Sequence, residues 1–365
     1  MAAIDFPSSP TTGQTFTSGG VTWIWDGVKW TATGAAAPFV LPMNDNRIIN
    51  GDMRIDQRNN GASGTASGYT VDRWAYVGTQ PTKGQWQRGA PGATSSPGQA
   101  GFNYDLSFAS SSAYTALATD QFAFYQTIEA DFASDFAWGT AGAQPVTLSF
   151  WTTSTLTGTF SGAIKNQAST RSYPFAFSIP IANNWVKIVV TIPGDTGGAW
   201  VMSGNAGAIL VVFDLGSGAN FRGAAGSWQS ANLNGVTGAI QIVATNGATF
   251  YVTGVKLEIG SIATPFNRQS LAKSMADCQR YFQSLASVQI ASASTTAGTY
   301  VTASLFPQVT MRSAPTIVQS GNTYGACTSV ATNPASPTSV TTNLGGCTAN
   351  ASCWAQVNLA LSAEL

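Results

Sequence analysis

Apolar residues recur along this chain in short runs that alternate with polar residues, and Gly, Asn, Ser, Thr and Pro separate one run from the next. Alternation with a period of two is typical of a half-buried strand, whereas the helical period of about 3.6 residues is nearly missing. Many short strands with turn residues between them predict an all-β sandwich. We expect strands over residues 146–153, 173–179, 185–192, 208–215, 238–245 and 249–259.

Charge is scarce in this chain. Only 9% of the 365 residues are charged, 16 basic side chains balance 16 acidic ones, and histidine is absent. A neutral chain lacks the basic surface on which nucleic-acid affinity depends, so no nucleic-acid partner is expected. Without histidine there is no imidazole for a catalytic triad or a pH switch.

The cysteines and the first residues exclude further classes of protein. Four cysteines are too few for a disulfide scaffold. Cys327, Cys347 and Cys353 lack the paired spacing of a zinc site, so no metal and no cofactor is expected; a disulfide among them and free thiols both stay open. The first residues show no apolar core of a secretory signal, and the apolar runs are too short to span a bilayer, so no membrane insertion is expected.

Residues 1–40 form a separate piece with an aromatic hairpin. The dipeptide Asp26-Gly27 favours a tight two-residue turn, which pairs Trp25 with Val28 and places that valine on the aromatic face. A lone hairpin is marginal in water, so this face is expected to pack on a sister chain or an anchor protein, with sugar stacking as the less favoured alternative. The tryptophans of this face are Trp23, Trp25 and Trp30.

A large β domain is expected over residues 41–268. In two of its strands the apolar residues alternate strictly, which leaves Trp151 and Trp185 among polar residues on the face away from the core. A flat aromatic ring beside hydroxyl and amide groups suits stacking on a sugar ring, so these two tryptophans are the candidate glycan-binding residues. Burial of both rings between subunits is an equal alternative.

Residues 269–285 are predicted to form a linking helix. Its apolar residues follow spacings of four, three, four and three, which is a heptad seam suited to packing against symmetry-related copies. Packing of this helix on its own sandwich is the alternative. The seam consists of Leu271, Met275, Cys278, Phe282 and Leu285.

The last segment, 286–365, contains only two charged side chains, Arg312 and Glu364. An exposed surface so poor in charge is prone to association. We therefore expect a β domain that is buried in an oligomer or that contacts glycans through uncharged polar groups.

Two acidic clusters are candidates for the pair of carboxylates that a glycoside hydrolase needs. One cluster comprises Asp120, Glu129, Asp131 and Asp135, and a second comprises Asp52, Asp56 and Asp72 among Arg47, Arg54, Arg58 and Arg73. Neither has a diagnostic spacing, and the second is typical of local ion pairs and turns. No enzyme is expected, and a depolymerase that uses the Asp120–Asp135 carboxylates is the least favoured reading.

Several motifs resemble those of one protein class. Residues 6–16 and 23–30, FPSSPTTGQTF and WIWDGVKW, resemble an N-terminal segment of bacteriophage virion and tail proteins. The opening of a phage tail-fibre domain is similar to NRIINGDMRIDQR at 46–58 followed by YTVDRW at 69–74. VKLEIGSIATPF at 255–266 resembles the end of that domain, and CQRYF at 278–282 resembles the helix that follows it. The order of the motifs matches the family.

This resemblance implies a homotrimeric tail fibre or receptor-binding appendage of a virion. Its central domain would be a jelly roll like carbohydrate-binding modules, and residues 286–365 a β-sandwich tip. Trp74 would be a core residue, and Thr253-Gly254 stands where related jelly rolls carry an acidic pair, so no calcium site is carried over.

The partners implied are the chain's own copies, a virion tail or baseplate protein that holds the N-terminus, and a bacterial surface polysaccharide. Uncharged surfaces suit a neutral glycan, and many copies on one virion would supply avidity. Such a protein is made in the host cytoplasm without a signal peptide. A head, collar or tail decoration protein without a receptor is the alternative.

Overall fold

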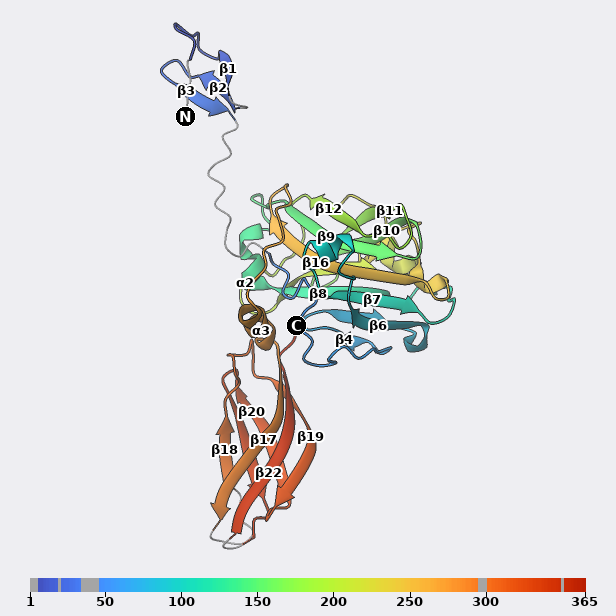
Figure 1. The fold of residues 1–365 in the computed structure, drawn as a ribbon, viewed down its shortest axis with the longest axis vertical. Helices are drawn as coiled ribbons and strands as arrows, with labels where there is room; N and C mark the ends of the chain where they lie inside the picture. The colour runs from blue at the N-terminus through green and yellow to red at the C-terminus, as the bar shows by residue number, and fades with distance from the viewer. Residues whose placement is uncertain (1–5, 19–20, 34–45, 295–300, 349–350) are drawn as a thin grey trace. The chain divides into compact units, whose positions relative to one another are not determined.

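The computed structural model describes residues 6–18, 21–33, 46–294, 301–348 and 351–365, and almost all of its regular structure is β (Figure 1). The chain divides into two compact units, Met1–Asp45 and Asn46–Leu365. No helix in the described ranges is long and apolar enough to cross a membrane. The all-β fold class predicted from the alternating pattern is confirmed.

The smaller unit is a three-stranded antiparallel sheet of β1 (Thr15–Ser18), β2 (Val21–Trp25) and β3 (Trp30–Thr33). A hairpin forms where the sequence predicts one, but the two-residue turn is wrong. Trp25 pairs with Trp30, so the loop has four residues, and the Asp26 carboxylate accepts the N–H groups of Val28 and Lys29 at 2.8 Å each. These hydrogen bonds explain the longer loop, which leaves Val28 83% exposed and off the aromatic face.

The aromatic face of this unit is covered by its own chain. The ring centroid of Phe6 lies 5.2 Å from that of Trp23 and 5.4 Å from that of Trp30. Trp25 lies 5.7 Å from Trp30, and Phe16 pairs with Trp23 across β1 and β2. Part of the packing that was expected from another protein is therefore supplied inside the unit, and attachment of this unit to a virion stays a prediction.

The larger unit contains a sandwich of two antiparallel sheets, ordered β11-β10-β13-β8-β5-β4 and β12-β9-β16-β7-β6. Their facing sides enclose one core rich in aromatic rings, such as Phe150 and Phe213 with centroids 4.9 Å apart. The strands are β4 (Gly68–Tyr69), β5 (Ala75–Gly78), β6 (Gly84–Gly89), β7 (Asp105–Ser110), β8 (Phe122–Glu129), β9 (Val146–Ser154), β10 (Gly158–Asn166), β11 (Ser172–Ile179), β12 (Val186–Ile192), β13 (Gly207–Asp214) and β16 (Thr249–Ile259).

Short elements fill the connections of the sandwich. A two-stranded parallel pair joins β14 (Arg222–Gly223) to β15 (Gly235–Val236). The remaining turns are α1 (Ser96–Gln99), α2 (Ala130–Ala133) and the 3₁₀ turns Pro81–Lys83, Ser134–Phe136, Ala219–Phe221 and Ile242–Ala244. The strand expected over 238–245 is therefore wrong, because Ile242 and Val243 are buried by a 3₁₀ turn that packs on the core and not by strand pairing.

The segment around Trp74 confirms two sequence expectations. Trp74 is fully buried and donates its indole N–H to the carbonyl of Asn50 at 3.2 Å, which makes it a core residue. The second acidic cluster forms local contacts: Asp56 accepts the N–H of Gly61 at 2.7 Å, and Asp72 lies 3.9 Å from Arg58. These carboxylates hold turns and ion pairs.

The C-terminal part consists of two three-stranded sheets, β17-β22-β19 and β18-β21-β20, around a second core. Their strands are β17 (Phe282–Ser294), β18 (Val301–Leu305), β19 (Thr316–Gly325), β20 (Ser329–Ser336), β21 (Ser339–Gly345) and β22 (Ala351–Ser362). Cys327, Cys347 and Cys353 are buried in this core as free thiols, as is Cys278 elsewhere. The option of a disulfide is not realised in this structure.

The helix predicted over 269–285 is shorter than expected. α3 covers Leu271–Gln279, with Ser270 capping its first turn by accepting the N–H of Lys273 at 3.2 Å. Phe282 and Leu285 lie on β17, where they pair with Ser362 and Leu359 of β22. The heptad seam is therefore wrong: Cys278 is buried, Met275 is half-buried, and Leu271 is 60% exposed. Trimer formation, which that seam was meant to serve, stays a prediction.

Asp105 at the start of β7 gives a pH test of this fold. The residue is 1% exposed and its Oδ1 has no hydrogen-bond partner. Burial raises the pKa of Asp105 to about 7, against a smaller opposing effect of the Gly89 N–H. The carboxyl therefore keeps its proton longer in the folded state, and stability is lost as the pH rises from about 4 to about 7.

We predict that Asp105→Asn is more stable than the wild type by an amount that grows with pH, by up to roughly 4 kcal/mol between about pH 4 and pH 8. Urea unfolding of both proteins at the two pH values measures this difference. Asp135→Asn, whose side chain is 52% exposed, is the control and should show no such trend. A stability difference that is equal at both pH values would contradict the prediction.

Candidate functional site

Trp151 and Trp185 lie on the same face of the five-stranded sheet, the face turned away from the core. Trp151 of β9 stands between Lys187 of β12 and Thr253 of β16 in the strand register. Trp185 immediately precedes β12, and its ring centroid lies 6.2 Å from that of Tyr251. Both tryptophans are half-buried. The facing predicted from alternation is therefore present, whereas their role in glycan binding stays a prediction.

Trp151 and Trp185 differ from the other tryptophans of the sandwich in the hydrogen bonding of their indole N–H groups. Neither Trp151 nor Trp185 donates a hydrogen bond to another residue in the described ranges, and both N–H groups stay open to solvent. A ligand that stacks on either ring therefore finds a free donor at its edge. The tryptophans that donate to an acceptor inside the sandwich are Trp74, Trp86, Trp138, Trp200 and Trp228.

A pocket of about 250 Å³ opens beside Trp151, and we call it the Trp151 pocket. The rings of Phe102 and Phe266 meet edge to face in it, with centroids 5.0 Å apart, and the Arg268 guanidinium lies 4.3 Å from the Phe102 ring centre. Its lining residues are Ala100, Phe102, Ser149, Trp151, Lys187, Gly254, Pro265, Phe266 and Arg268. Aromatic rings and cationic side chains thus meet in one small cavity.

Gly254 makes room for this pocket. A bulge interrupts the pairing of β16 with β9 between Thr253 and Lys256, and Gly254 within it has a φ of +62°. A Cβ at this position would lie 2.7 Å from the Phe102 ring. The glycine is therefore required both by the left-handed backbone and by the close approach of Phe102.

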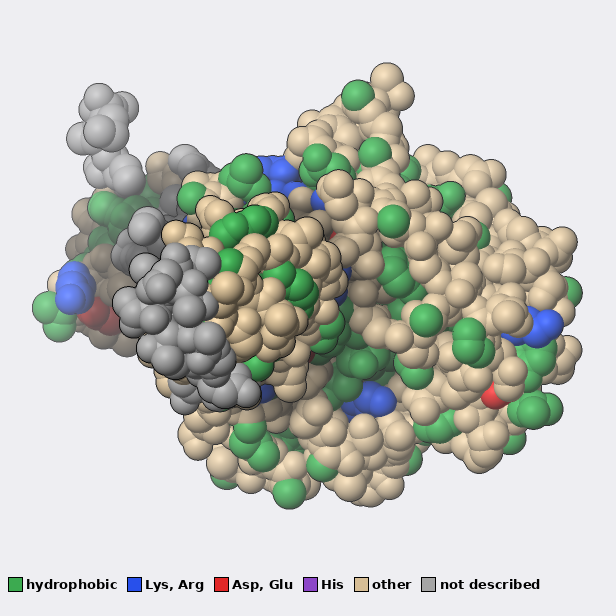
Figure 2. Space-filling view, turned by 90° about the horizontal axis from the view of Figure 1, so that it is seen from below, with side chains coloured by type: hydrophobic (Ala, Val, Ile, Leu, Met, Phe, Trp, Pro, Cys, Tyr) green, Lys and Arg blue, Asp and Glu red, His purple; other side chains and the backbone are tan. Residues whose placement is uncertain are grey.

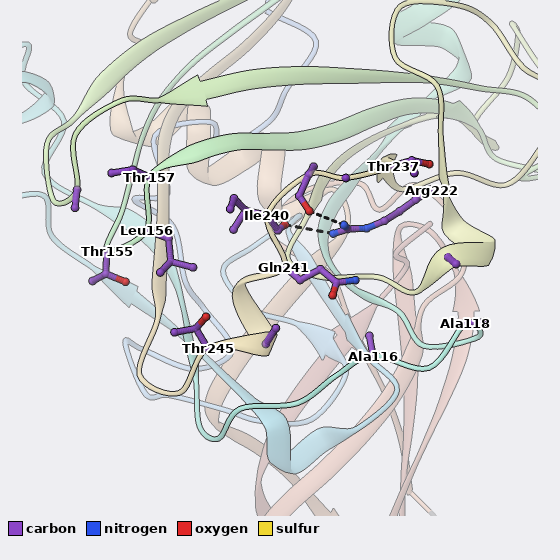
Figure 3. Close-up of a pocket in the computed structure, with 15 residues that line it drawn as sticks. Ala116, Ala118, Thr155, Leu156, Thr157, Arg222, Thr237, Ile240, Gln241 and Thr245 are labelled. Carbon is purple, nitrogen blue, oxygen red and sulfur yellow. Dashed lines mark hydrogen bonds between the residues drawn. The ribbon is translucent and has the colours of Figure 1, made fainter.

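A second, larger groove of about 910 Å³ is lined by small and hydroxyl-bearing side chains (Figure 3). Its one charged lining residue, Arg222, pairs with Asp214 at 2.6 Å and donates to the carbonyl of Ala239 at 2.7 Å. No aromatic ring lies among the residues that line it. The groove offers hydrogen bonds but no stacking platform, so it fits a sugar ring less well than the Trp151 pocket does.

The four carboxylates considered for catalysis are each engaged in the structure. Tyr114 and Thr79 donate to Asp120 at 2.7 and 2.8 Å, and these bonds lower its pKa against the opposing effect of burial. The other three carboxylates are bound as follows: Glu129 by Arg280 and Tyr281, Asp131 by the N–H of Gly204, and Asp135 by Arg47. None of the four lines the Trp151 pocket or the larger groove.

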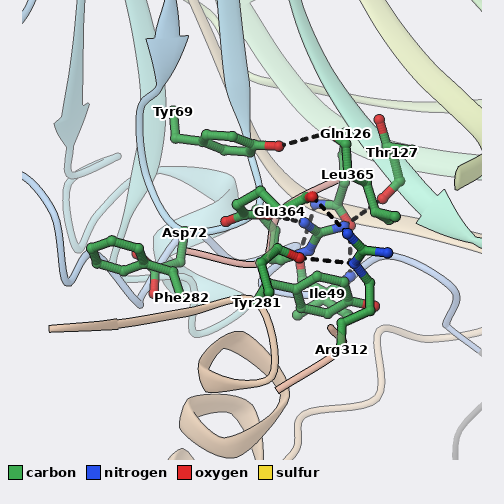
Figure 4. Close-up of polar contacts among 12 residues, drawn as sticks. Ile49, Tyr69, Asp72, Gln126, Thr127, Tyr281, Phe282, Arg312, Glu364 and Leu365 are labelled. Carbon is green, nitrogen blue, oxygen red and sulfur yellow. Dashed lines mark hydrogen bonds and ion pairs between the residues drawn. The ribbon is translucent and has the colours of Figure 1, made fainter. Parts of the chain in front are cut away.

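Arg73, Glu364 and their neighbours form a buried polar cluster, shown in Figure 4. The Arg73 guanidinium binds the Glu364 carboxylate, donates to the Thr127 carbonyl at 2.6 Å and lies 3.6 Å from the Tyr281 ring centre. Arg312 donates to the carbonyl of Glu364 at 2.9 Å. These contacts join the C-terminal sheets to the sandwich, and the Nε of Arg73 is the one guanidinium nitrogen of that residue that is buried without a hydrogen-bond partner in the described ranges.

Sequence reasoning missed most of the Trp151 pocket. Lys187 occupies an outward position of a strand whose alternation is visible in the sequence, so the same signal points to it. Phe102, Phe266 and Arg268 come from irregular segments that carry no periodic signal.

In the described ranges no three Cys, Asp or Glu side chains gather as a metal site.

No family model matches the chain, and no curated protein matches it. Among solved structures, a proposed sugar-binding protein from Bacteroides thetaiotaomicron is similar at 11% identity and a TM-score of 0.34, over 59% of this chain and 100% of that one. The carbohydrate-binding module TmCBM61 in complex with β-1,4-galactotriose is similar at 11% identity and a TM-score of 0.30, over 60% and 100%.

The enzymatically active domain of tailspike protein 4 from bacteriophage CBA120 is similar at 12% identity and a TM-score of 0.30, over 59% of this chain and 21% of that one. At these values no ligand or activity passes from the similar structures to this chain. The fold assignment rests on the two sheets of the sandwich themselves.

We predict that Glu129→Ala lowers the free energy of unfolding by roughly 3 kcal/mol, because it leaves the Arg280 and Tyr281 groups without their partner. Chemical denaturation measures the loss. Asp135→Ala, which removes an exposed partner of Arg47, is the control and should cost less than about 1 kcal/mol. Unchanged stability together with loss of a polysaccharide-cleaving activity would favour a catalytic role for Glu129 instead.

Proposed function

We propose that this chain is a non-enzymatic, glycan-binding protein of a bacteriophage tail fibre, and that it binds a bacterial surface polysaccharide at the outer face around Trp151 and Trp185. The observation that carries the proposal is the pair of half-buried tryptophans on one face whose N–H groups have no partner among the residues that the structure describes. A sugar presents an apolar ring face and hydroxyl groups at its edge, which match an indole ring and its N–H donor.

The composition of the surface supports this reading. The face shown in Figure 2 is mostly uncharged, with a few isolated charged side chains. Such a surface recognises its ligand by stacking and short-range hydrogen bonds more than by long-range attraction. Weak binding at each site would be compensated by many copies on one particle, because linked sites raise the effective concentration of the ligand.

The virion role rests on the sequence motifs. The N-terminal segment and the bracketing motifs of the large domain resemble those of tail-fibre proteins, and their order is the same. In this proposal the unit before residue 46 attaches to a tail or baseplate protein, and three chains form the fibre. A depolymerase is the less favoured alternative in this proposal, because each of the four candidate carboxylates contacts a protein partner and none lines either pocket.

We predict that Trp151→Ala and Trp185→Ala each weaken binding to the cognate polysaccharide at least tenfold, which is about 1.4 kcal/mol, because stacking area and a donor are lost. An array of immobilised bacterial surface polysaccharides identifies the ligand, and titration measures the affinity of each variant. Tyr324→Ala removes an aromatic side chain that is 40% exposed in the C-terminal sheets and is the control.

Full affinity in both folded tryptophan variants would exclude this face as the site. A wild-type protein that binds no polysaccharide and no host cell would favour the alternative of a decoration protein without a receptor.

We predict that the protein in solution has a mass of about 113 kDa, three times the 37.8 kDa of one chain, because tail fibres close with threefold symmetry. Light scattering on a sizing column measures this mass. A single species near the mass of one chain would overturn the trimer and leave an isolated binding module.

A further inference from the structure

Two cationic side chains enter the Trp151 pocket, and no carboxylate lines it. Lys187 is exposed on β12, directly beside Trp151 in the strand register. Arg268 stacks on Phe102 and donates to the Ala100 carbonyl at 2.7 Å. Neither cation forms an ion pair with any residue in the described ranges.

The other charges near the pocket are already paired. Lys256, the next cation on β16, is buried and lies 3.0 Å from the Glu258 carboxylate, so the two charges offset each other. Asp52 is close enough to Arg268 to be influenced by it, but its carboxylate faces Arg54 at 3.4 Å. The excess positive charge of the site therefore belongs to Lys187 and Arg268.

This excess stands out because most charged side chains in the described ranges are held in ion pairs. Buried charges include Arg73 with Glu364, Arg222 with Asp214, and Lys256 with Glu258. The Trp151 pocket combines two unpaired cations with aromatic rings, whereas the unpaired Lys165 is buried and donates to Asn232 and Asn234 at 2.9 Å each. Because aromatic walls displace water, an anion held there interacts with them more strongly than in bulk solvent.

We propose that the Trp151 pocket binds a sugar residue that carries a negatively charged substituent, a carboxylate, a sulfate or a phosphate. The volume of about 250 Å³ suits one sugar ring, which stacks on Trp151 while its anionic group lies between the Lys187 ammonium and the Arg268 guanidinium. The guanidinium offers paired donors that match a planar or tetrahedral anion. This inference rests on the proposed glycan binding and replaces its expectation of a neutral ligand with an acidic one.

The test compares acidic and neutral glycans on one array with the full-length protein. The array carries bacterial surface polysaccharides together with three matched pairs: a polyuronate and its carboxyl-reduced form, a sulfated galactan and its desulfated form, and a phosphate-containing teichoic acid and its dephosphorylated repeat. The variants are Lys187→Gln, Lys187→Glu and Lys273→Gln. Lys187 has no partner to lose, so its variants are expected to fold. Lys273 is an exposed lysine on α3 and serves as the matched control.

We expect every glycan that binds the wild type to carry an anionic residue, and we expect removal of that charge to abolish the signal. Lys187→Gln should weaken binding about tenfold, Lys187→Glu should weaken it further, and Lys273→Gln should leave it unchanged. Added salt should weaken wild-type binding and affect Lys187→Gln less. The matched pair that responds identifies the anionic group.

Two outcomes count against the inference in different ways. Binding to neutral glycans alone, lost in Trp151→Ala but unchanged in Lys187→Glu, overturns the acidic ligand and leaves the proposed function standing. Absence of binding to every glycan overturns the proposed function and the inference together.

Discussion

The guanidinium of Arg73 holds together four segments that are distant in the sequence. It is 2% exposed and contacts the Glu364 carboxylate, the Thr127 carbonyl of β8 and the ring of Tyr281. A cation at this depth is stable only while all its partners are in place, because each lost partner leaves a charge or a polar group without compensation. The cluster lies where β17 begins and where Glu364 meets the sandwich, and it is one of the contacts that join both parts in one compact unit.

The small number of charged residues also determines the composition of the molecular surface. With 32 charged residues in 365, and several of them buried in pairs, the surface keeps mainly hydroxyl, amide and small apolar groups. Recognition by such a surface depends on shape, stacking and hydrogen bonds. A local exception, such as Lys187 beside Trp151, then has an effect on ligand choice that it would not have on a highly charged protein.

Local alternation predicted the strands well where both faces of the sheet are distinct. β9, β12 and β16 lie close to their expected bounds because apolar side chains at every second position need one common core. The prediction of a helix over 269–285 was wrong because the partners of its last residues lie far away in the sequence. Phe282 and Leu285 fit a helical spacing, but their backbone groups pair with β22, which lies more than seventy residues further along the chain. No local window contains that partner.

The candidate site likewise contains some residues that the sequence predicts and others that it does not. Trp151 and Trp185 could be selected from the sequence because each stands on the polar side of an alternating strand. The cavity beside Trp151 could not, since it requires the bulge at Gly254 and the edge-to-face contact of Phe102 with Phe266, which brings together residues more than 160 positions apart. Alternation reports which way a side chain points from its sheet. What covers that sheet depends on loops, and here the loops convert an exposed aromatic ring into one wall of a charged pocket.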